Sequence, residues 1–197
     1  MSVRVIGLTG SIGMGKSATA ALFSRRGVPV HDSDAVVHRL YAGEAAPLIE
    51  AAFPGVTVGG KVDRARLAER IVGDHPALAQ LEAIVHPLVR LSEERFRSTA
   101  RAEGRRLALV DVPLLFETGA DNRFDVLVVV TADPEIQRGR VLARPGMTEK
   151  KFASLLGRQM PDAEKRRRAH FLVDTGHGSP AAEREVDCIL RALASIP

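Results

Sequence analysis

A glycine-rich segment near the N-terminus carries the clearest chemistry in the sequence. Residues 10–17 read GSIGMGKS, which fits the pattern G-x-x-x-x-G-K-[ST]. Glycines let the backbone curl around an anion with its N–H groups pointing inward, and a helix that starts directly after them adds partial positive charge. In such a loop Lys16 reaches the β- and γ-phosphates and the Ser17 hydroxyl binds magnesium.

This loop predicts a site for a nucleoside triphosphate, because it follows a predicted strand and precedes a predicted helix. The alternative is a glycine turn beside an unrelated surface lysine, which this strand–loop–helix context disfavours. The residues that we expect to bind ATP here are Gly10, Ile12, Gly13, Met14, Gly15, Lys16, Ser17 and Ala18.

Two acidic residues, Asp32 and Asp34, follow the second predicted strand. Ligands of an open parallel sheet gather outside the carboxyl ends of its strands. A kinase needs a carboxylate there to orient the acceptor hydroxyl and accept its proton. Either aspartate could instead cap the helix expected from Ala35. We favour a catalytic role for at least one of them.

Further charged residues could act on phosphates. Asp111 ends the third predicted strand and could bind magnesium, or it could simply form the turn before Pro113. Arg138, Arg140 and Arg144 are predicted to share one helix, either as a lid that closes over the phosphates or as a solvated surface. The run KRRR at residues 165–168 could also be a nucleic-acid patch.

The elements that must position these residues follow from hydrophobic patterning. Short apolar runs predict five strands, at residues 3–8, 28–31, 107–112, 126–131 and 171–173. Runs this apolar between helical segments indicate a parallel sheet covered on both faces, and hence an α/β fold. Helices are predicted at residues 17–26, within 132–170 and at 181–193.

Residues 35–103 contain no comparable strand and are predicted to form an inserted helical lobe. Glycines and a proline at residues 54–60 predict a loop within it, and Pro76 and Pro87 are expected to interrupt its helices.

Composition limits the class of protein. With 197 residues, 45% hydrophobic and 26% charged, the chain has the size and content of one ordinary globular domain. A single cysteine excludes an internal disulfide and a multi-cysteine zinc site, and favours the cytoplasm. The net charge of +4 suits an anionic substrate or nucleic acid, although the absence of Trp disfavours base stacking. We expect no signal peptide and no membrane span.

Several longer segments together resemble the dephospho-CoA kinase family. They are GLTG at residues 7–10, DSD at 32–34 followed by His38, VDR at 62–64, LEAIVHP at 81–87, DVPLLFE at 111–117, and the series Arg140, Arg144 and Gln159. The likeness runs over nearly the whole chain. Pro145 and Thr175 depart from the family pattern, where aspartate and asparagine are frequent.

This resemblance implies a P-loop NTPase fold of the nucleoside-monophosphate-kinase type. The expected parts are a nucleotide-binding core (1–34, 104–136 and 169–197), a helical CoA-binding lobe (35–103) and a helical lid (137–168). It implies transfer of phosphate from ATP, with Mg²⁺, to the 3′-hydroxyl of the ribose of dephospho-CoA, which is the last step of CoA biosynthesis. We expect no nucleic-acid or membrane partner, and a monomer or weak homo-oligomer.

By matching position, the resemblance assigns roles to single residues. The expected catalytic residues are Asp34, Lys16 and Arg140, with Arg144 on ATP and with Ser17 and Asp111 on the metal. The expected substrate-binding residues are Thr9, Asp32, His86, Arg90, Leu114 and Glu117. His86 could instead be a capping or core histidine. The alternative functions are another small-molecule or nucleotide kinase, and a non-catalytic, nucleotide-dependent protein that binds nucleic acid.

Overall fold

The computed structural model describes residues 3–195, which form two compact units. One unit comprises residues 3–31 and 100–195 and contains a central sheet. The other comprises residues 32–99 and is mainly helical. No helix within residues 3–195 is both long and apolar enough to cross a membrane.

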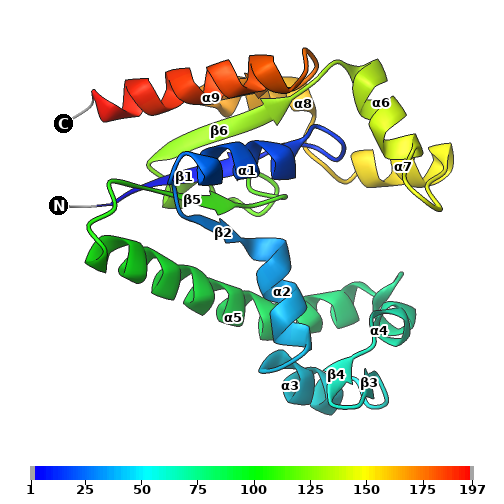
Figure 1. Cartoon of the computed structure of the whole chain (residues 1–197). Coiled ribbons are helices and arrows are strands. Elements are labelled where there is room, and N and C mark those ends of the chain that lie inside the picture. The colour runs from blue at the N-terminus through cyan, green and yellow to red at the C-terminus, as the bar shows by residue number, and fades with distance from the viewer. Residues whose placement is uncertain (1–2, 196–197) are drawn as a thin grey trace. The chain divides into compact units, whose positions relative to one another are not determined.

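Five strands form the sheet, in the order β2-β5-β1-β6-β7 (Figure 1). Their bounds are β1 Arg4–Thr9, β2 Val30–Asp32, β5 Leu107–Asp111, β6 Val126–Thr131 and β7 Phe171–Asp174. Strand β1 pairs in parallel with both β5 and β6, and β6 pairs in parallel with β7. The predicted α/β class with a five-stranded parallel sheet is confirmed.

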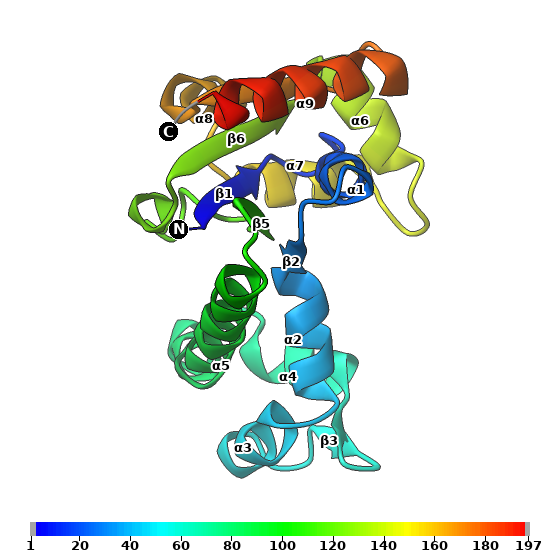
Figure 2. The same cartoon turned by 60° about the vertical axis from the view of Figure 1, so that its left-hand side comes forward.

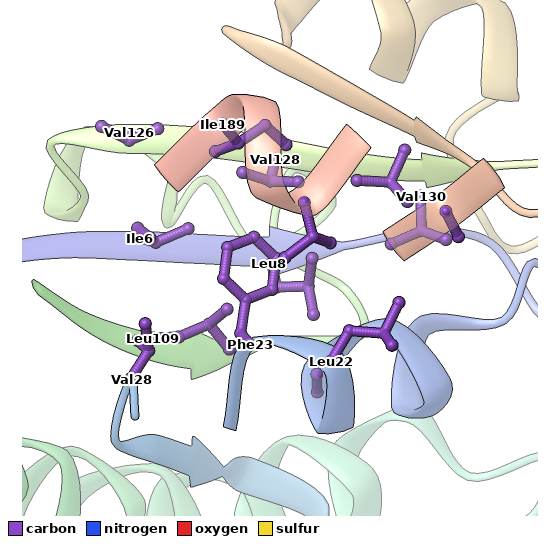
Figure 3. Close-up of a cluster of buried hydrophobic side chains, with 14 of the residues drawn as sticks. Ile6, Leu8, Leu22, Phe23, Val28, Leu109, Val126, Val128, Val130 and Ile189 are labelled. Atoms are coloured by element: carbon purple, nitrogen blue, oxygen red, sulfur yellow. The ribbon is translucent and has the colours of Figure 1, made fainter. Parts of the chain in front are cut away.

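One face of the sheet packs against helices α1 (Lys16–Arg25) and α9 (Ser179–Ala194). Alternate residues of the strands, such as Ile6 and Leu8, point to this face because side chains alternate along a strand. Figure 3 shows Phe23 of α1 among these side chains, and it is fully buried. Burial of such a ring contributes roughly 1.5–3 kcal/mol, so this layer fixes α1 firmly against the strands.

The other face is in close contact with the segment that follows β5. A Cβ atom at Gly7 of β1 would lie 2.7 Å from the ring of Phe124 and 2.9 Å from Leu115. Glycine is therefore required there for close packing. This side also carries the short helix η1 (Asp121–Arg123) and helix α8 (Asp162–Arg168), which contacts β6. Helices α6 (Pro134–Leu142) and α7 (Glu149–Leu156) lie between β6 and α8 in the chain.

The prediction that Arg144 shares a helix with Arg138 and Arg140 is wrong. Helix α6 ends at Leu142, and Arg144 lies in a bend beyond it. The cause is Pro145, because the ring of a proline disfavours the helical conformation of the residue before it. Only Arg138 and Arg140 therefore belong to α6.

The helical unit contains α2 (Ser33–Tyr41), α3 (Ala45–Ala52), α4 (Arg64–Ile71) and α5 (His75–Ala102), the last of which ends in the sheet unit. Its own core joins side chains of α2, α3 and α5, such as Val36, Ile49 and Val85. Figure 2 shows strand β3 of a small hairpin near α3. The hairpin pairs β3 (Thr57–Val58) with β4 (Lys61–Val62).

Two expectations for the helical unit need correction. A hairpin replaces the plain loop, because Gly59 and Gly60 have φ values of 58° and 77°, which suit a tight two-residue turn. Helix α5 also runs through Pro87 without interruption. A proline removes one helical hydrogen bond, but the buried side chains Leu81 and Val85 on the preceding turns secure the helix on its core.

Candidate active site

The phosphate loop lies between β1 and α1, as the motif predicts. Gly13 and Gly15 have φ values of 81° and 90°, which residues other than glycine rarely adopt. No side chain caps the first turn of α1, whose N-cap is Gly15. Free N–H groups at a helix N-terminus attract anions, so this turn can bind phosphate.

Lys16 and Asp111 form an ion pair at the carboxyl ends of β1 and β5. The side chain of Lys16 is 15% exposed and that of Asp111 is 5% exposed. The register explains the pairing, since Leu8 of β1 stands opposite Asp111 of β5. An ammonium group has three N–H donors, so Lys16 can bind a phosphate while it remains paired.

Thr9 belongs to the same end of the sheet. It is buried, and its Oγ1 donates a hydrogen bond to the carbonyl oxygen of Pro113 at 3.2 Å. Three of the residues singled out in the sequence, Thr9, Lys16 and Asp111, are thus brought together around the loop.

Oxygen ligands for a metal ion are present at this edge. Mg²⁺ prefers one or two protein oxygens and takes the rest from phosphates and water. The Asp111 carboxylate lies beside Lys16, and the Ser17 hydroxyl lies in the exposed first turn of α1. This donor set suits Mg²⁺ bound together with phosphate. Residues 3–195 contain no group of three or more His, Cys, Asp or Glu side chains that could hold a metal ion alone.

Arg140 of α6 reaches the phosphate loop through Thr175. Its Nη1 donates to Thr175 Oγ1 at 2.7 Å and its Nη2 donates to the Thr175 carbonyl oxygen at 2.8 Å. Thr175 Oγ1 in turn donates to the carbonyl oxygen of Met14 at 2.7 Å. A Cβ at Gly15 would lie 3.0 Å from the same Oγ1. The loop, Thr175 and Arg140 therefore form one contact network.

Ile12 of the loop is bound on both of its backbone groups by glutamine side chains. Gln159 Oε1 accepts a hydrogen bond from the Ile12 N–H at 3.0 Å. Gln137 Nε2 donates to the Ile12 carbonyl oxygen at 2.7 Å. Sequence reasoning missed Thr175, Gln137 and Gln159 as contacts of the loop. Gln159 and Thr175 were noted only for their places in the family pattern, and Gln137 was not noted at all.

Glu117, expected to bind substrate, is engaged within the protein. Its Oε1 accepts from the Met160 N–H at 2.8 Å and lies 2.8 Å from Nζ of the fully buried Lys165. Burial alone raises the pKa of Glu117, but the contacts with Lys165 and Met160 outweigh it, and the pKa lies below its usual value. Glu117 is therefore a charged anchor for the segment between α7 and α8.

The basic run at residues 165–168 is only partly available to a partner. Lys165 is buried against Glu117, and Arg168 pairs with Asp121 and stacks 4.6 Å above the ring of Phe116. Arg166 and Arg167 remain exposed. Two of the four cations thus have structural partners, which weakens the nucleic-acid alternative.

The remaining predicted residues are mostly exposed. Asp32 caps α2, where its carboxylate accepts from the Ala35 N–H at 2.9 Å, and Asp34 is exposed in the first turn of that helix. His86 and Arg90 are exposed one turn apart on α5. Other exposed positions are Ala18, Leu114 and Arg144.

Comparison with known proteins identifies the family. A family model described as dephospho-CoA kinase matches residues 4–180. The protein named dephospho-CoA kinase from Mesorhizobium japonicum is 60% identical over 189 residues, which cover 96% of both chains. The one from Agrobacterium fabrum is 59% identical over 191 residues, which cover 97% of this chain and 98% of the relative. The chain belongs to the dephospho-CoA kinase family.

Solved structures share the fold of this chain. TT1252 from Thermus thermophilus superposes with a TM-score of 0.86 at 34% identity and covers 100% of both chains. A dephospho-CoA kinase from Campylobacter jejuni superposes with a TM-score of 0.66 at 20% identity, and the match covers 96% of this chain and 97% of that kinase. Shikimate kinase from Acinetobacter baumannii superposes with a TM-score of 0.55 at 22% identity, and the match covers 98% of this chain and 94% of that kinase. The last two show the shared kinase fold alone.

Proposed function

We propose that this member of the dephospho-CoA kinase family transfers the γ-phosphoryl group of ATP to the 3′-hydroxyl of the ribose of dephospho-CoA. The match over residues 4–180 carries this proposal, because it spans the phosphate loop and the helical unit alike. The products are ADP and CoA. We further propose that the enzyme works in the cytoplasm as a monomer or weak homo-oligomer, without a nucleic-acid partner.

This reaction gives a role to each residue that is expected to be catalytic or to bind the metal. Asp34 accepts the proton of the ribose hydroxyl, whose oxygen attacks the γ-phosphorus as the bond to the bridging oxygen of ADP breaks. Lys16 and Arg140 neutralise charge on the transferring group. Ser17 and Asp111 hold Mg²⁺, which supplies positive charge at the phosphate oxygens.

Further groups bind the two substrates. ATP lies on Gly10, Ile12, Gly13, Met14, Gly15 and Ala18, with Arg144 beside it. Dephospho-CoA contacts Thr9, Asp32, His86, Arg90 and Leu114. We also propose that residues 35–103 bind CoA and that residues 137–168 act as a lid, which excludes water from the phosphates. For Glu117 we prefer the structural role, because Lys165 and Met160 occupy its Oε1.

An acceptor panel tests the proposal. The purified chain is given Mg²⁺ and ATP with dephospho-CoA, AMP or shikimate, and ADP release is measured in a coupled assay. We expect release with dephospho-CoA alone, and mass spectrometry with ³¹P NMR should locate the new phosphate on the 3′-oxygen. Release with only AMP or shikimate would reject the substrate, while salt-sensitive binding of duplex DNA without any phosphorylation would favour the nucleic-acid alternative.

A further inference from the structure

The backbone N–H and carbonyl groups of Ile12 are both bound by side chains from distant parts of the chain. Gln137 lies in α6 and is buried, with 4% of its surface exposed. Gln159 follows α7. The two hydrogen bonds join one residue of the loop to positions 125 and 147 residues away. They therefore hold the loop in place from outside its own sequence.

The backbone next to Gln159 is fixed by a separate contact. The Met160 N–H donates to Glu117 Oε1, and Lys165 neutralises that carboxylate. This places a chain of contacts from the buried Lys165 through Glu117 to the backbone next to Gln159. The side chain of Gln159 therefore extends to Ile12 from a backbone that is held in place on its C-terminal side.

A loop that binds an anion must aim several N–H groups at one point, and ordering those groups at the moment of binding costs affinity. Because Gln159 accepts from the Ile12 N–H, that N–H serves the shape of the loop, and the uncapped first turn of α1 is left for phosphate. The two bonds also oppose rotation of the two peptide groups that flank the Ile12 Cα. The loop is therefore held in shape by the protein itself.

We propose that Gln159 is a positioning residue, which fixes the Ser11–Ile12 peptide group so that the phosphate loop is already shaped for the nucleotide. Gln137 holds the next peptide group, Ile12–Gly13, through the carbonyl oxygen of Ile12. The inference takes the ligand of the loop to be ATP, as the proposed function does, but it does not depend on the acceptor.

Gln159→Met tests this role, since methionine keeps the length of the side chain and removes the acceptor oxygen. We expect amide exchange of Ile12, followed by NMR in the free protein, to become about tenfold faster or more. Binding of a non-hydrolysable ATP analogue with Mg²⁺, measured by calorimetry, should weaken by about 3- to 10-fold, which corresponds to one hydrogen bond. The KM for ATP should rise more than the KM for dephospho-CoA.

Gln159→Glu keeps an acceptor oxygen and adds a negative charge near the phosphates. It should preserve the exchange protection of Ile12 while ATP still binds more weakly, because like charges repel. Gln80→Met, at an exposed position of α5, is the matched control and should change neither measurement.

Unchanged Ile12 exchange in Gln159→Met would overturn the proposal, and so would unchanged affinity for the ATP analogue. Both measurements are made without an acceptor. A protein that protects Ile12 in this way but does not phosphorylate dephospho-CoA would contradict the proposed function and leave the present inference intact.

Discussion

Lys165 and Glu117 form an ion pair in which no part of the lysine side chain and only 15% of the glutamate side chain reach solvent. Removing one charge of a buried pair leaves the other unneutralised, which costs more than the pair itself contributes. This pair connects α8 to the segment after β5, so its loss should lower the stability of the whole sheet unit.

Glu117→Gln should therefore lower the free energy of unfolding by about 3–5 kcal/mol at pH 7. Urea denaturation followed by circular dichroism measures this loss. Glu149→Gln is the control, because the Glu149 side chain is 57% exposed and pairs with Arg138 at the surface. An exposed pair contributes about 1 kcal/mol or less. Similar losses in both variants would contradict the structural role of Glu117.

The same carboxyl predicts a dependence of stability on pH. Folding lowers the pKa of Glu117 below its ordinary value of 4.5. A carboxyl of this kind contributes stability above its unfolded pKa and loses that contribution as the pH falls through its folded pKa. The unfolding free energy of the wild type should thus decrease below about pH 4.5, and Glu117→Gln should show a smaller decrease. Parallel curves from pH 7 to pH 3 would exclude this contribution.

Asp34→Asn should reduce kcat by a factor of about 10² to 10⁴ and leave ATP binding nearly unchanged, because asparagine cannot accept the proton of the hydroxyl. Steady-state assays and calorimetry separate the two effects. Asp74→Asn is a fair control, since Asp74 accepts from the Ala77 N–H and asparagine caps a helix equally well. Turnover near that of the wild type in Asp34→Asn would remove Asp34 from the mechanism.

Lys16→Met should weaken both ATP binding and turnover, because the ammonium group interacts with phosphates in the ground state and in the transition state. It also leaves Asp111, which is 5% exposed, without its cation. Lys150→Met, at an exposed position of α7, serves as the control. Equal affinity for an ATP analogue in Lys16→Met and wild type would be inconsistent with a phosphate-binding lysine.

Two glycines should respond to alanine in opposite directions. At Gly7 the added Cβ meets Phe124 at 2.7 Å in the core, and such overpacking costs about 1–3 kcal/mol. At Gly139, within α6, nothing lies within 4 Å of the added Cβ. Alanine there should stabilise the helix by roughly 0.5–1 kcal/mol. Thermal unfolding of the two variants measures whether stability falls or rises. A more stable Gly7→Ala variant would contradict the close contact between β1 and Phe124.

Much of the sheet could be predicted because hydrophobic runs report strands directly. Strand β6 has the predicted bounds Val126–Thr131, whereas the second strand is shifted to Val30–Asp32. The proximity of Lys16 and Asp111 also follows from a simple rule, since parallel strands bring their carboxyl ends to one edge. Their catalytic roles stay predictions.

Contacts between polar side chains could not be predicted in the same way. Nothing in the types of Gln159 and Ile12 indicates that they meet, because their hydrogen bond depends on how α6, α7 and the following turn fold back on the loop. The residue type of Thr175 likewise does not predict its hydrogen bonds with Arg140 and Met14. Such partners are set by tertiary structure and not by local pattern.

The burial of Lys165 also protects its amine from amine-reactive reagents in the folded enzyme. The chain has five lysines, of which Lys61, Lys150 and Lys151 are exposed, whereas Lys16 is 15% exposed and Lys165 is not exposed at all. Among the lysines, coupling to an activated ester surface should therefore proceed through Lys61, Lys150 and Lys151. The enzyme can be immobilised in this way with the ion pair of Lys165 intact, and labelling of Lys165 would report unfolding.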